Sequence, residues 1–91
     1  MIGYITLGTN HFEQAVAFYD QLLALVGESR LWQTDTMAAW GPSREHPALC
    51  IAKPHDGMPA CTGNGVMIAL KVSTAAQVDL VHAKALALGG T

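Results

Sequence analysis

The stretch IGYITLGTNHFEQAVAFYDQLLALVG (residues 2–27) decides the fold, because its apolar residues change from the period of a strand to that of a helix. In the predicted strand Ile2–Leu7, a period of two places neighbouring side chains on opposite faces of a sheet. Ile5 suits the face that a helix covers. Tyr4 and Thr6 then point to the other face, where we predict the functional site.

The remainder of this stretch predicts an amphipathic helix over Phe12–Val26. Its apolar residues recur at helical spacing and form one broad stripe. Asn10 is the predicted N-cap, and Glu13 lies three positions on, as in a capping box. Gly27 is expected just beyond the helix, because glycine readily adopts the left-handed backbone that ends many helices.

The strand–helix pattern returns near the end of the sequence. Val66–Val72 alternates like a strand, and Ala75–Leu88 has the apolar spacing of a second helix. Thr74 with Gln77 offers a second capping box, and Gly89-Gly90 is expected to end the helix.

Three short antiparallel strands are predicted between the two copies, at Arg30–Thr34, Met37–Trp40 and Ala48–Lys53. A loop rich in Pro and Gly, His55–Gly65, follows them. The expected fold class is therefore α+β, in one domain over residues 1–91. A first βαβββ module occupies residues 1–54 and a linking loop residues 55–65. A partial second module (βα) occupies residues 66–91, and the final three strands of the repeat are absent from the sequence.

Composition excludes several classes of function. The chain has 91 residues, of which 51% are apolar and 13% charged, with a net charge of −2, so a packed core is expected. The five basic residues are scattered, which argues against nucleic-acid binding. The longest apolar runs have five residues, whereas about 20 are needed to span a bilayer. Cys50 and Cys61 lack metal-site spacing and no secretory signal is visible, so we expect reduced thiols in a cytoplasmic protein.

Several segments, in this order and spacing, resemble one known family. They are MIGYITLGTN (residues 1–10), AVAFYD (residues 15–20), KPHDG (residues 53–57) and GNG (residues 63–65). Together they are similar to the vicinal oxygen chelate superfamily, which contains glyoxalases, bleomycin-resistance proteins and extradiol dioxygenases. The resemblance covers essentially the whole chain, and it implies two βαβββ modules whose sheets curl into a partial barrel around a cleft.

The resemblance also implies positions for a divalent metal in that cleft, and this sequence departs from the pattern there. Family members commonly have His in the first strand of each module, and the corresponding residues here are Tyr4 and Met67. A carboxylate often comes late in each module, but Ala48–Lys53 has none, and Cys50 is its nearest polar candidate. A phenol with a pKa near 10 and a thioether do not hold a hard cation at neutral pH.

We therefore predict a metal-free small-molecule binding protein with no cofactor. Tyr4 and Met67 are expected to point into the same hollow. Trp32 and Trp40, together with Met67, are interpreted as an apolar wall for a flat ligand, and ordinary core packing is the competing interpretation. The predicted cleft residues are Tyr4, Thr6, Trp32, Trp40, Cys50 and Met67.

Two alternatives remain open at this point. One is a metal-dependent lyase or dioxygenase of the same superfamily, which would bind a divalent metal through other residues or a partner chain. The other is a truncated, non-catalytic module that acts only in an oligomer. Unpaired strand edges favour association, so a homodimer is expected, and neither a nucleic acid nor a membrane is a predicted partner.

Overall fold

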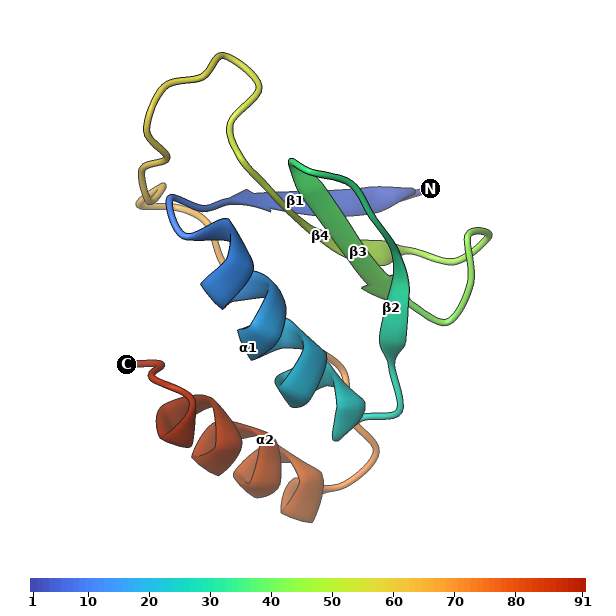
Figure 1. Cartoon of the computed structure of the whole chain (residues 1–91). Helices are drawn as coiled ribbons and strands as arrows, with labels where there is room; N and C mark the ends of the chain where they lie inside the picture. The colour runs from blue at the N-terminus through green and yellow to red at the C-terminus, as the bar shows by residue number, and fades with distance from the viewer.

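The structure is a computed structural model that describes residues 1–91. Its N-terminal part is a four-stranded mixed sheet with one helix, α1 (Phe12–Ala24), packed on one face (Figure 1). We call this part the βαβββ unit. Its strands match the prediction to within two residues at either end. They are β1 (Tyr4–Gly8), β2 (Ser29–Gln33), β3 (Met37–Gly41) and β4 (Ala48–Ala52).

The strands are arranged in the order β1-β4-β3-β2. β1 and β4 are parallel, whereas β4 pairs antiparallel with β3 and β3 pairs antiparallel with β2. A parallel pair needs a long connection, which here runs through α1, β2 and β3. The predicted turn at Thr34-Asp35 is confirmed, and the Thr34 hydroxyl accepts hydrogen bonds from the backbone N–H groups of Thr36 and Met37.

Helix α1 begins at Phe12, as predicted, and Gly27 follows it as predicted, but its last residue is Ala24 and its N-cap is not the predicted one. Gly27 has φ +81° and Glu28 N–H donates to the Leu23 carbonyl at 3.0 Å, the hydrogen bond of a Schellman motif. The N-cap is His11, whose side chain makes no capping bond, so the assignment of Asn10 as N-cap was wrong. The Asn10 amide instead bonds both backbone groups of Ala60, at 2.9 and 2.7 Å. Asn10 thereby ties the linking loop to the end of β1.

The hydrophobic core lies between α1 and the sheet. Six buried residues form it, and Leu7, Tyr19 and Leu49 pack around them. Trp40 is the largest, with 2% of its surface exposed. The core residues, all from the βαβββ unit, are Phe12, Val16, Leu23, Ala38, Trp40 and Ile51.

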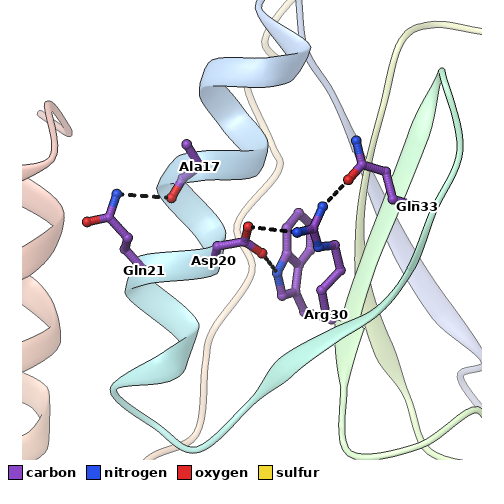
Figure 2. Close-up of polar contacts among 6 residues, drawn as sticks. Ala17, Asp20, Gln21, Arg30 and Gln33 are labelled. Atoms are coloured by element: carbon purple, nitrogen blue, oxygen red, sulfur yellow. Dashed lines mark hydrogen bonds and ion pairs between the residues drawn. The ribbon is translucent and has the colours of Figure 1, made fainter.

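A polar contact ties α1 to the strands beneath it (Figure 2). The Trp40 indole N–H donates to Asp20 Oδ1 at 2.8 Å, and Arg30 lies 3.3 Å from Asp20 Oδ2. Arg30 also donates to the Gln33 side chain. The hydrogen bond satisfies the one polar atom of a buried tryptophan, which would otherwise cost stability.

The chain beyond the linking loop differs from the prediction in one element. Val66–Val72 forms no strand, so that prediction was wrong; no strand of this chain lies beside it to accept or donate ladder hydrogen bonds. The second helix, α2 (Ala75–Ala87), does form, and the Thr74 hydroxyl accepts from Gln77 N–H at 3.1 Å, as predicted. Gly89, with φ +104°, lies just beyond its end.

Helix α2 packs against α1 and contacts no strand (Figure 1). None of its residues is buried. The arrangement is therefore a sheet, then α1, then α2. Both helices are too short and insufficiently apolar to cross a membrane.

Candidate functional site

The face of the sheet away from α1, which we call the open face, carries most of the predicted site residues. Residues paired directly across strands point to the same face. Thr6 pairs with Cys50, Cys50 with Ala39, and Ala39 with Trp32. These four residues therefore form one row that crosses all the strands on the open face. Tyr4 lies two residues before Thr6 and points the same way.

The two middle residues of the row are covered, whereas its ends reach the surface. Cys50 and Ala39 have small side chains and no exposed surface, so neighbouring side chains of the open face cover them. Trp32 is half-buried on β2, while Thr6 on β1 is exposed. We call the row from Thr6 to Trp32 the trough; a molecule on this face would contact Trp32 and Thr6 at its two ends. Tyr4, which is 63% exposed, has its phenol at the β1 edge of this trough.

Cys50 contributes packing to this row and no reactive group. Burial raises the pKa of the Cys50 thiol, because desolvation disfavours the charged thiolate. A thiol is nucleophilic as the thiolate, so a raised pKa lowers its reactivity at neutral pH.

Trp40 lies on the opposite face of the sheet from Trp32. It pairs with Arg30, and its ring packs in the core 5.7 Å from that of Tyr19. The sequence interpretation placed both tryptophans in one wall of the cleft. The structure places them on opposite faces of the sheet, so they do not form one wall. The cause is alternation along β3: Ala39 occupies the open face, so its neighbour Trp40 must point toward α1.

Met67 also lies apart from Tyr4. It is 88% exposed, and it borders a cavity with Leu7 and Tyr19 on the α1 side. The expectation that Tyr4 and Met67 point into one hollow was therefore wrong for this chain. It depended on a strand at Val66–Val72 that would extend the open face beyond β1, and that strand is not formed.

The open face offers a poor set of donors for a divalent metal ion. Tyr4, Thr6 and Cys50 are its polar residues near the trough, and none is a carboxylate or an imidazole. Hard divalent ions need such oxygen or nitrogen ligands. No group of three or more His, Cys, Asp or Glu side chains anywhere in the chain is arranged to hold a metal ion. The residues present do not fit the metal that the family resemblance implies.

A comparison with solved structures identifies the fold. The crystal structure of a glyoxalase/bleomycin resistance protein from Albidiferax ferrireducens T118 matches with a TM-score of 0.90 and 28% sequence identity. The match covers 100% of this chain and 72% of that chain. The match supports the resemblance of this chain to the vicinal oxygen chelate superfamily. No family model and no curated protein matches the sequence.

This match confirms the resemblance drawn from residues 1–10, 15–20, 53–57 and 63–65, and it confirms the α+β fold class. It does not change the donor set described above. Sequence reasoning missed two residues that lie on the open face, Ala39 and Met37. Their alternation along the predicted strand Met37–Trp40 was the available signal, but without the cross-strand register it could not say which pair faced the trough.

Proposed function

We propose that the open face binds a small, largely apolar molecule, without a metal ion. The observation that carries this proposal is the row from Thr6 to Trp32, on a face of the sheet that neither helix covers. Binding sites of this kind are mostly apolar, and a few polar groups orient the ligand. In the trough the hydroxyls of Thr6 and Tyr4 would serve that purpose.

Trp32 supplies the main attraction for a planar ligand. An aromatic pair adds about 0.5–1.5 kcal/mol beyond the burial of its area. The Thr6 hydroxyl, at the other end of the row, has no hydrogen-bond partner within the chain and can bond a polar group of the ligand. An aromatic molecule with one polar substituent therefore fits the row best.

A second surface is needed to enclose such a ligand. The open face is a wall, whereas sites that bind small molecules tightly bury most of the ligand. We propose that two copies of the chain form a homodimer and that the ligand lies between a trough and the partner. The exposed β1 edge, where Tyr4 and Ile5 are 63% and 39% exposed, favours association because strand edges readily pair.

A thermal-shift screen of purified protein against aromatic and thiol metabolites tests the proposal. A ligand at 100 times its Kd should raise the stability by about 2.7 kcal/mol. Thr6→Val removes the hydroxyl with little change of shape and should weaken binding. Thr36→Val, an equivalent change in the turn between β2 and β3, should leave binding unchanged. Equal affinities for the two variants would contradict a role for the trough.

Two further measurements test the remaining parts of the proposal. Elemental analysis of the purified protein is expected to find no bound metal in proportion to the chain. Stoichiometric zinc, nickel, manganese or iron would instead favour a metal-dependent lyase or dioxygenase. Light scattering at micromolar concentration is expected to give the mass of a dimer, and a stable monomer that binds ligand equally well would refute the shared site.

A further inference from the structure

Three cavities meet on the α1 side of the sheet, opposite the open face. Leu70 borders all three. Their volumes are about 370, 260 and 240 Å³. The largest lies between the sheet and Ile68–Lys71, the second between α1 and α2, and the third beside Tyr19. We call these neighbouring cavities, which share Leu70 in their walls, the Leu70 channel.

The walls of the channel are mostly apolar. Leu23 of α1 and Val26, just beyond that helix, border two of the cavities, and Leu49 of β4 borders two. The indole N–H of Trp40 is already bonded to Asp20, so its ring presents no unsatisfied polar atom to the channel. Such walls favour apolar molecules, because covering apolar surface removes it from water.

The charged groups of the channel border only the largest of its three cavities. Glu28 and Lys71 border the largest cavity, and neither forms an ion pair, since the structure has a single one, between Arg30 and Asp20. The rim thus carries one charge of each sign. A ligand head with one charge would be attracted by one of these groups and repelled by the other. A neutral polar head that both donates and accepts hydrogen bonds suits both.

The segment that covers the channel is weakly held. Val66–Val72 makes no ladder hydrogen bonds, and α2 buries none of its residues. The cover can therefore move aside for a ligand at little cost in free energy. We propose that the Leu70 channel binds a molecule with one unbranched alkyl chain and an uncharged polar head. The channel holds the chain, and Glu28 and Lys71 bond the head.

The two tryptophans allow this site to be told apart from the open face, because Trp40 borders the channel and Trp32 lies in the trough. In Trp32→Phe, the remaining Trp40 should lose fluorescence when 10-bromodecan-1-ol is added, because bromine quenches a ring that it contacts. Unbrominated decan-1-ol should restore the emission by competition. Absence of quenching in Trp32→Phe would overturn the proposal.

Trp40→Phe keeps only the tryptophan on the open face. Its emission should not change with the same probe. Quenching in Trp40→Phe alone would place the alkyl molecule in the trough, which would overturn the channel while leaving the proposed function intact. Conversely, failure of every aromatic ligand to bind the open face would not affect the Trp40 result.

Matched substitutions within the Trp32→Phe chain locate the site further. Leu70→Phe fills the junction of the three cavities, and displacing about two methylene groups of the probe should weaken binding about tenfold. Leu80→Phe makes the same change on α2 at a residue that is 53% exposed and borders none of these cavities, so binding should be unchanged. Equal effects of the two variants would refute the channel as the site.

The head group is tested with probes of equal chain length. 10-Bromodecan-1-ol should bind more tightly than 10-bromodecanoic acid or 10-bromodecylamine at neutral pH. Glu28→Gln removes the negative charge at the rim, so it should improve binding of the acid relative to the alcohol. If the chain that keeps both Glu28 and Lys71 binds the amine or the acid more tightly than the alcohol, the assignment of an uncharged head is wrong.

Discussion

The βαβββ unit and residues 66–91 have similar apolar patterns in the sequence but very different packing in the structure. Helix α1 lies on a four-stranded sheet and contributes Phe12, Val16 and Leu23 to the core. Helix α2 has the same length as α1 and is likewise followed by a glycine with positive φ, but it buries no residue. The strand pattern of Ile2–Leu7 becomes β1, whereas that of Val66–Val72 becomes an unpaired segment.

The difference shows what an apolar pattern can and cannot specify. Apolar residues that recur every 2 or every 3.6 positions indicate which side of a strand or helix should be covered. It does not supply the covering surface. β1 pairs with β4 and its Leu7 packs against the core, while Val66–Val72 pairs with no strand. We therefore expect the stability of this chain to reside in the βαβββ unit.

The largest expected effect comes from a matched pair of leucine substitutions. Leu23 of α1 is 4% exposed in the core, whereas Leu86 of α2 is 50% exposed. Leu23→Ala should lower the free energy of unfolding by about 2–5 kcal/mol, because it leaves a cavity. Leu86→Ala should change it by about 0.5 kcal/mol or less. Denaturant titrations followed by circular dichroism measure both.

If the two leucine variants lose comparable stability, α2 is packed against something that the single chain does not show. A larger loss for Leu86→Ala at high than at low protein concentration would identify that surface as another copy. A loss independent of concentration would mean that α2 belongs to the cooperative core. In that case the contrast between the two regions would be wrong.

A smaller effect is expected from the polar contact that joins α1 to the sheet. Asp20→Ala leaves the indole N–H of buried Trp40 without an acceptor, and this should cost about 1–3 kcal/mol. Asp20→Asn keeps an oxygen that can accept the bond and loses chiefly the half-exposed ion pair with Arg30, worth about 1 kcal/mol or less. Thermal unfolding at low and high salt separates the two terms. Equal losses for both variants would show that the ion pair dominates.

Sequence reasoning was accurate where structure is determined locally. The strands of the βαβββ unit, the turn at Thr34-Asp35, the cap at Thr74 and the glycines after each helix all depend on a few neighbouring residues, and all are present. It failed where a residue had a distant partner. Asn10 has the chemistry of an N-cap, but its amide bonds the backbone of Ala60, fifty positions away.

The candidate site was only partly predictable for the same reason. Alternation along one strand correctly placed Tyr4 and Thr6 opposite Ile5 and Leu7, because it needs no other strand. Placing Trp32 and Trp40 required the register between β2 and β3, which shifts between Arg30 and Trp32. No sequence pattern in those strands indicates that shift.

The smallest expected effect tests whether α2 opens independently of the βαβββ unit. Thr74→Ala removes the hydroxyl that accepts from Gln77 N–H, which should destabilise α2 by about 1 kcal/mol. His11→Ala is the matched change at α1, where the N-cap side chain makes no bond, and should have little effect.

Amide hydrogen exchange should then show roughly fivefold faster exchange in α2 of Thr74→Ala and unchanged exchange in β3, because local opening lowers protection only in the part that opens. Faster exchange in β3 as well would mean that α2 unfolds together with the sheet, and the two regions would then form one cooperative unit.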